Sequence, residues 1–304
     1  MKIVTYNIQF GLGKDERFDL ERIASEVDGA DIIALQEVER YWHRSGNTDQ
    51  PKQLALLLNK YYWVYGPYFD VDASKPEHDG SIKNIRRQFG NMILSKTPIL
   101  STRLFTLPKS ALRHRHNMVV GVLEGVIKLK NNRALRIYNA HLSARSQYDR
   151  MAQISALRQI IRRAPGEGGT WTGPDMVSTT EADGQNLWAE DSTPPPMPEP
   201  FVLLGDFNLE SRDPEYDHLV GTKDGNLGRN SSTDNFIDTW VAAGHEENQG
   251  VTYVDVSNSG EARGIRIDYA FVDESMNKQI LGTRIDEQTQ GSDHQPYWIE
   301  FNFE

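Results

Sequence analysis

The sequence predicts a fold that mixes α-helices with β-strands, and two observations carry that prediction. A strand at 2–7, a helix at 18–28 and a strand at 31–39 make a βαβ-like opening. Short apolar runs bounded by polar turns then recur as far as the C-terminus. With 304 residues, 38% of them hydrophobic and 25% charged, the chain resembles a soluble globular protein that forms one large domain or two ordinary ones.

The period of the apolar residues places the remaining elements. Further strands are expected at 61–69, 89–95, 98–107, 117–130, 134–143, 201–210, 251–256, 266–272 and 295–303. Further helices are expected at 50–60, 145–163, 213–220 and 232–244. The polar segment 72–88 predicts a long surface loop.

Residues 165–200 interrupt this pattern, because they are rich in proline, glycine and acidic side chains and have no period that would bury a face. We predict an insertion loop between the helix at 145–163 and the strand at 201–210. Its two tryptophans, Trp171 and Trp188, could pack it down as a lid over a site; a flexible surface loop is the alternative.

The run FVLLGDFNLE (201–210) predicts a strand buried on both faces that ends at Gly205. Period two would then place Asp206 and Asn208 on the same side of the strand end. A carboxylate there can accept a proton, and a carboxamide can donate hydrogen bonds to a developing anion. The alternative is a strand followed by a simple Asx turn.

Polar groups of similar chemistry end most of the other strands. A single histidine such as His141 after an apolar run is usually a capping or packing residue, so the recurrence matters more than any one position. The oxygen and nitrogen groups at strand ends are Asn7, Glu37, His141, Asp206, Asn208, Asp268, Asp293 and His294. Strands packed side by side would project them from one edge of the sheets, where ligands of α/β folds bind.

A dense basic run lies at Arg113, His114, Arg115 and His116. In a chain with a net charge of −10, such a run indicates either an anion site or a solvated loop. We treat Arg113, His114 and Arg115 as candidate substrate-binding residues.

The chain resembles the endonuclease/exonuclease/phosphatase (DNase I-like) superfamily of metal-dependent phosphoesterases. The resemblance covers nearly the whole chain in the ordered motifs TYNIQ, LQEVE, GNMILSKTPI, NAHLS, GDFNLE, RIDYAFV and SDHQP. It implies an α+β fold class and a single domain over 1–304, with the fold of a four-layer αββα sandwich. Two mixed β-sheets would pack face to face with helices outside, and the site would lie at one edge.

By this resemblance Glu37 is the principal Mg²⁺ ligand and Asn7 a supporting one, with Mn²⁺ as an alternative ion. Both are hard oxygen donors, which suit Mg²⁺. Asp293 matches a position that binds metal or supports a histidine.

The resemblance also assigns catalytic roles. Asp206 would orient and deprotonate the attacking water, while Asn208 and His141 would donate hydrogen bonds to the phosphoryl oxygens. His294 matches a second active-site histidine near the scissile phosphate, and Asp268 would fix its tautomer and stabilise its charged form.

Composition narrows the alternatives. The absence of cysteine excludes disulfides, thiolate catalysis and cysteine metal sites, and it fits a reducing compartment. We expect a cytoplasmic protein with no signal peptide and no transmembrane segment.

The substrate is expected to be a small or lipid-derived phosphoester. The alternative is a nuclease that acts on DNA or RNA, which the acidic net charge disfavours because such an enzyme makes broad contacts with the phosphate backbone. A noncatalytic binding module with the same fold is a further alternative. No protein partner can be inferred.

Overall fold

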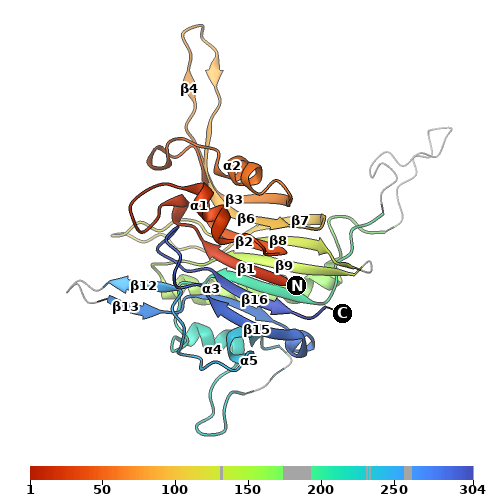
Figure 1. Ribbon diagram of the computed structural model, residues 1–304. Coiled ribbons are helices and arrows are strands. Elements are labelled where there is room, and N and C mark those ends of the chain that lie inside the picture. Colours follow the sequence, from red (N-terminus) through yellow and green to blue (C-terminus); the bar gives the residue numbers. More distant parts are fainter. Residues whose placement is uncertain (131–132, 174–192, 231, 233, 257–261, 304) are drawn as a thin grey trace, which may run out of the picture.

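The structure is a computed structural model that describes residues 1–130, 133–173, 193–230, 232, 234–256 and 262–303. Within this part of the chain, two six-stranded sheets form the body of the molecule (Figure 1). The first has the order β15 (Ile280–Ile285), β16 (Tyr297–Phe301), β1 (Lys2–Asn7), β2 (Ile32–Arg40), β6 (Arg86–Ser95) and β3 (Tyr62–Asp72). The second has the order β11 (Ile237–Asp238), β14 (Asp268–Val272), β10 (Phe201–Asp206), β9 (Ala134–His141), β8 (Gly121–Lys128) and β7 (Ile99–Thr106).

Shorter elements complete the described chain. Two small antiparallel pairs are β4 (Lys75–Pro76) with β5 (Ile82–Lys83), and β12 (Tyr253–Val256) with β13 (Ala262–Ile265). The α-helices are α1 (Leu20–Glu26), α2 (Gln50–Leu57), α3 (Gln147–Glu167), α4 (Pro214–Val220) and α5 (Thr239–Ala242). Three 3₁₀ turns are η1 (Gln9–Gly11), η2 (His43–Ser45) and η4 (Glu274–Gln279).

Three apolar layers hold these elements together. Alternate residues of one strand face different layers, so β1 buries Ile3 between the two sheets and Val4 on the outer side. The outer layer of the first sheet packs against α1 and α2, and that of the second sheet against α3 and α4. The predicted four-layer sandwich of two mixed sheets with helices outside is therefore confirmed.

Strand direction brings the ligand-type residues to one edge. β1 and β2 are parallel, and so are β9 and β10, which places Asp206 opposite His141. β14 runs antiparallel to β10, so that its first residue, Asp268, pairs with Asp206, the last residue of β10. The carboxyl ends of both parallel pairs therefore meet the start of β14 at the same edge of the sandwich.

A buried amide network joins the two sheets just behind this edge. Asn139 of β9 donates from Nδ2 to the carbonyl oxygens of Leu35 (2.9 Å) and Met92 (3.0 Å) in the opposite sheet. Gln36 donates to Asn139 Oδ1 (2.8 Å), and Asn91 donates to the Asn139 carbonyl (2.7 Å). These side chains are fully buried, so each lost partner would leave a desolvated polar group.

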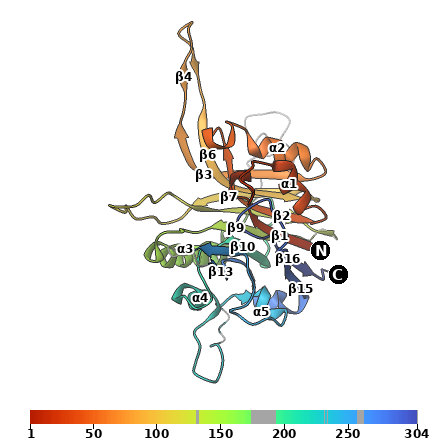
Figure 2. The same cartoon turned by 60° about the vertical axis from the view of Figure 1, so that its left-hand side comes forward.

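The structure corrects several sequence predictions. Segment 72–88 is not a loop: β3 and β6 pair as far as Asp72 and Arg86, and the short strands β4 and β5 pair beyond them, so that a hairpin projects from the body in Figures 1 and 2. Both faces of its outer part are exposed, so no apolar alternation marks it as strand. The helix expected at 232–244 covers only Thr239–Ala242, and β13 and β15 were not anticipated.

The predicted insertion at 165–200 starts later than expected, because α3 continues through Pro165 to Glu167. Most of the rest, 174–192 with Trp188, lies outside the described residues. The choice between a lid and a surface loop therefore stays open, as does the single-domain prediction for 1–304. In the described chain, no helix has both the length and the apolar character to cross a membrane.

Replacing Asn139 with leucine should lower the free energy of unfolding by about 3 kcal/mol, since two buried carbonyls and the Gln36 amide lose a partner. Urea denaturation measures the change. Asn59→Leu, at an exposed position, is the control and should shift stability by less than about 0.5 kcal/mol. Equal small shifts in both variants would show that the network does not stabilise the sandwich.

Candidate active site

A β-bulge presents Glu37. The register between β2 and β6 shifts between Leu35 and Val38, and both of these residues pack on the outer side of the sheet. Glu37 is the extra residue in between, with a left-handed φ of 60° that is uncommon for a residue with a side chain. The bulge redirects its carboxylate to the sheet edge, where 21% of the side chain stays accessible. Local backbone strain is thus concentrated at the expected metal ligand.

Asp206 ends β10 at the centre of the cluster. Its Oδ2 accepts a hydrogen bond from Asn7 Nδ2 (2.9 Å), and its Oδ1 accepts one from the backbone N–H of Asn208 (2.9 Å). Gly205 has a φ of 140°, and a Cβ there would collide with the carbonyl oxygen of Ala140. Only glycine therefore lets β9 and β10 approach this closely beside the site.

Asn208 is held by a turn and not by strand periodicity. Its φ is 52°, and its side-chain nitrogen donates to the Leu142 carbonyl (3.1 Å). The expectation that Asp206 and Asn208 leave the strand on one side by period two is wrong, because β10 ends at Asp206. The Asx turn and the polar site, treated as alternatives from the sequence, occur together.

His294 and Asp268 form a buried pair. His294 Nδ1 lies 2.8 Å from Asp268 Oδ2, and its Nε2 lies 3.8 Å from Asp206 Oδ2. Burial alone would lower the pKa of His294, but the Asp268 and Asp206 carboxylates outweigh it and raise the pKa to about 10. The pair therefore stabilises the fold fully below the ordinary histidine pKa, and this contribution is lost as the pH rises towards 10. The Tyr253 ring packs against His294, 4.9 Å between ring centroids.

His141 faces the same carboxylates with its other ring nitrogen bound to Tyr68. His141 Nε2 lies 3.6 Å from Asp206 Oδ2 and 3.9 Å from Glu37 Oε1, while Nδ1 lies 2.8 Å from the Tyr68 hydroxyl. Burial, together with the charge of His294, lowers the pKa of His141 to about 3, so the ring is neutral. The carboxylates favour the proton on Nε2, and Tyr68 then donates to the bare Nδ1.

Tyr68 is a site residue that the sequence did not reveal. It lies in the aromatic run of β3, where nothing distinguishes it from the neighbouring tyrosines, and it is 5% exposed. Burial and the charge of Glu37 raise its pKa well above the usual tyrosine value, so the hydroxyl keeps the proton that it donates. Its contact with His141 could be recognised only from the structure, because the two residues lie in strands of different sheets, β3 and β9.

The donor set suits a divalent cation. Ligand atoms of Asp206, Asp268 and His294 lie within 4.8 Å of one another, and Asp268 Oδ1 is buried with no hydrogen-bond partner in the described chain. The protonated His294 ring has no free lone pair, so the carboxylate oxygens are the donors available to a cation. Burial raises the pKa of Glu37, and burial together with Asp268 raises that of Asp206 to about 7. The site holds more buried carboxylates than cationic side chains, so a metal ion would stabilise their negative charge. Carboxylate oxygens are suitable ligands for a hard ion.

Asn7 and Asp293, the two residues expected to support Glu37 in metal binding, differ in the atoms that face the site. Asn7 donates from Nδ2 to Glu37 Oε1 (3.2 Å) as well as to Asp206, while its Oδ1 accepts from the Gln9 N–H (3.0 Å). Its amide would have to turn over to offer oxygen to a cation. Asp293 is half-buried, and its carboxylate accepts a hydrogen bond from Ser292 (3.2 Å). The metal roles of both residues stay predictions.

The basic run meets the site only at its end. A pocket of about 190 Å³ opens beside Glu37 and His141 and is also lined by His116 and Arg145. Arg113, His114 and Arg115 are exposed and do not line it. The substrate role of these three residues stays a prediction. The pocket is lined instead by His116, the last residue of the basic run, and by Arg145, which the sequence did not single out.

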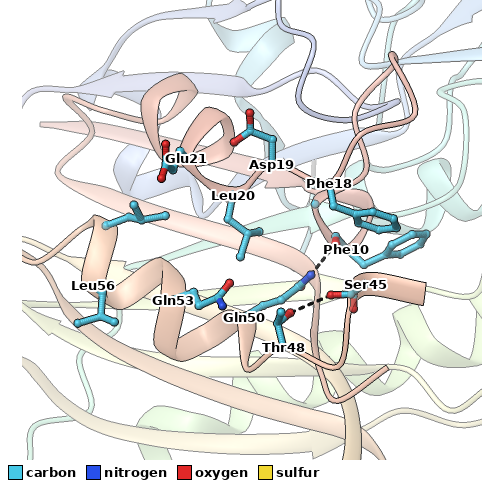
Figure 3. A pocket seen from close by; sticks show the side chains of 12 residues that line it. Phe10, Phe18, Asp19, Leu20, Glu21, Ser45, Thr48, Gln50, Gln53 and Leu56 are labelled. Atoms are coloured by element: carbon cyan, nitrogen blue, oxygen red, sulfur yellow. Dashed lines mark hydrogen bonds between the residues drawn. The ribbon is translucent and has the colours of Figure 1, made fainter. Parts of the chain in front are cut away.

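A larger hollow is not lined by any of the carboxylates or histidines of this cluster. It has a volume of about 480 Å³ beside η1, α1 and α2, with Phe18, Leu20 and Gln50 among its walls (Figure 3). Its only charged lining residues are Asp19 and Glu21. An acidic hollow without a cation does not suit a phosphate, so the cluster around Asp206 is the candidate active site.

Known proteins resemble the chain in their sequence profile and in their fold. The sequence profile of the Endonuclease/Exonuclease/phosphatase family matches residues 4–294. No curated protein shows significant sequence similarity to the chain.

Solved structures share the fold at low sequence identity. An endonuclease/exonuclease/phosphatase from Bacteroides vulgatus is 17% identical, with a TM-score of 0.63 over 100% of this chain and 98% of that one. A Bacteroides thetaiotaomicron mannosyl-6-phosphatase is 17% identical, with a TM-score of 0.58 over 100% of both chains. The human Nocturnin catalytic domain, solved with a bound sulfate anion, is 17% identical, with a TM-score of 0.58 over 100% of this chain and 93% of that one.

Without the Tyr68 hydroxyl, the His141 ring should no longer be held in a single tautomer. In ¹⁵N NMR spectra of the histidine rings we expect wild-type His141 to carry its proton on Nε2, and Tyr68→Phe to show a mixture of tautomers. Tyr65→Phe deletes the same atom from the same strand, where the hydroxyl donates to the Val38 carbonyl (3.1 Å), and should leave His141 unchanged. A wild-type proton on Nδ1, or no change in Tyr68→Phe, would contradict this assignment.

Proposed function

The chain belongs to the Endonuclease/Exonuclease/phosphatase family, and from that premise we propose that it is a metal-dependent hydrolase that cleaves a phosphoester bond. The family is one of phosphoesterases and nucleases. The observation that carries the proposal is the convergence on Asp206 Oδ2 of two histidine nitrogens, at 3.6 and 3.8 Å, and of Asn7 Nδ2 at 2.9 Å. Cationic and neutral donors thus surround one buried carboxylate.

We propose Mg²⁺ as the ion, with Mn²⁺ as a substitute. Glu37 would hold it, with Asp293 and, once its amide turns over, Asn7 as further ligands, because all three offer hard oxygen donors close to one another. When bound, such an ion neutralises charge that builds on the phosphoryl group and lowers the pKa of a coordinated water.

Asp206 is proposed to accept the proton of the attacking water. Burial raises the pKa of this carboxyl to about 7, so it is a stronger base than a solvated aspartate and takes up a proton near neutral pH. Its hydrogen bond from the Asn208 N–H leaves Oδ1 fixed, which orients the carboxylate towards the histidines.

Three side chains are proposed to stabilise the phosphoryl oxygens. His141 offers Nε2–H, His294 is cationic, and Asn208 keeps one amide proton free after its bond to Leu142. Asp268 holds the His294 ring and stabilises its charged form. Donors fixed in a buried site stabilise developing charge more strongly than solvated ones do.

A small or lipid-derived phosphoester is the proposed substrate. The net charge of −10 disfavours an enzyme whose affinity comes from many backbone phosphates, and one similar structure is a mannosyl-6-phosphatase. A nuclease on DNA or RNA is the second candidate, since the family includes nucleases.

Hydrolysis of bis-p-nitrophenyl phosphate tests the proposed reaction. Mg²⁺ should support turnover and a chelator should abolish it. Asp206→Ala and His294→Ala should each lower kcat by at least about 10²-fold while circular dichroism shows an intact fold.

The control is Glu21→Ala, which removes an exposed carboxylate from the acidic hollow and should leave kcat within about twofold. Near wild-type turnover in Asp206→Ala would remove that residue from the mechanism. No metal-dependent turnover of any phosphoester by the wild type would favour a noncatalytic binding module instead.

A further inference from the structure

The pocket beside the catalytic cluster has a rim with two basic side chains. Arg145 and His116 line it together with Glu37 and His141, from two segments that flank strands of the second sheet. Arg145 follows β9, and His116 precedes β8. A phosphoester bound at Asp206 would therefore have Arg145 and His116 on the side of Glu37 and His141.

A buried carboxylate holds the His116 segment in place. Asp149, at 2% exposure, accepts hydrogen bonds from the Ser110 N–H (3.0 Å) and from Asn117 Nδ2 (2.7 Å). Asn117 also donates to the Ser110 carbonyl (2.9 Å), so the two ends of loop 110–117 are tied together. This loop carries the basic run, and its anchored end delivers His116 to the pocket. A merely solvated loop would need no such buried anchor.

The arginine of this rim is not used in an ion pair. In the part of the chain that the structure describes, Arg145 makes no salt bridge or hydrogen bond and its side chain is exposed. The chain as a whole carries a net charge of −10, so a basic side chain beside the carboxylates of the cluster is a local exception. The guanidinium of Arg145 can therefore bind an anion of the substrate without first breaking an ion pair.

The remaining walls of the pocket are apolar. Phe89, Met118, Val120 and Leu142 line it between the catalytic carboxylates and the basic rim. A volume of about 190 Å³ accommodates a small ring or a short chain, because a water molecule occupies about 30 Å³ of liquid. Apolar walls with a cationic edge suit the linking part of a compact molecule that carries anions at both ends.

We propose that this pocket selects a substrate with a second anionic group, a compact bisphosphate, whose second phosphate binds Arg145 with support from His116. The inference rests on the proposed function only in placing the scissile phosphate at the catalytic cluster. Arginine binds phosphate through paired N–H groups, so loss of one such contact should cost at least about tenfold in affinity.

The test compares the binding of glucose 1,6-bisphosphate with that of glucose 1-phosphate and glucose 6-phosphate by titration calorimetry in Mg²⁺. An Asp206→Asn host prevents turnover of the bound esters. The host should bind the bisphosphate at least about tenfold more tightly than either monophosphate, and adding Arg145→Ala should remove most of that preference.

The matched control is Arg163→Ala, which deletes the same charge at an exposed position of α3, about 24 Å along the helix from its first residue. This variant should keep the preference. The inference is overturned if the host shows no preference, if the preference survives Arg145→Ala, or if Arg145→Ala weakens all three ligands equally. Wild-type hydrolysis of bis-p-nitrophenyl phosphate reports separately on the proposed function, so either proposal can fail while the other stands.

Discussion

The active-site geometry depends on a buried hydrogen-bond network that fixes the spacing of the two sheets. Asn139 bonds across the interface to two carbonyls and to Gln36, and all of these groups are buried. Gln36 immediately precedes Glu37, and Asn139 lies two residues before His141. Apolar packing alone would let the sheets slide with little penalty, whereas directional bonds between amides do not. The network therefore sets the distance between a metal-ligand candidate on one sheet and a histidine on the other.

Stability and chemistry make opposite demands on this edge. Several carboxylates are drawn together in a buried region, Glu37 adopts a left-handed conformation, and Asp268 Oδ1 has no partner among the described residues. Each feature is costly for the fold alone. The cationic His294 offsets part of the negative charge, and a divalent cation would offset more. Burial of apolar side chains in the three layers of the sandwich offsets the unfavourable free energy of these features.

The sandwich fold could be predicted from the family resemblance, and the polar residues at the strand ends from local patterns, whereas the roles of these residues stay predictions. An apolar run that ends in a polar residue is visible along one strand, and parallel strands bring such ends together. Tyr68, Arg145 and the bulge at Glu37 could not be predicted in this way. Tyr68 contacts His141 from a strand of the opposite sheet. Arg145 resembles any other exposed arginine in the sequence, and only the structure shows that it lines the pocket. The bulge at Glu37 is defined by the pairing of β2 with β6, which the sequence does not give. The hairpin over 72–88 was missed because its exposed faces carry no periodic signal.

The central claim is that the bulge in β2 delivers Glu37 to a divalent-cation site. Titration calorimetry of Mn²⁺ into the chelator-treated wild type and Glu37→Gln tests it most directly, with Glu287→Gln, at an exposed position, as the control. The account predicts saturable binding to the wild type and to the control, and an affinity at least about tenfold weaker in Glu37→Gln. Equal Mn²⁺ affinity in all three proteins, or no binding to the wild type, would contradict it.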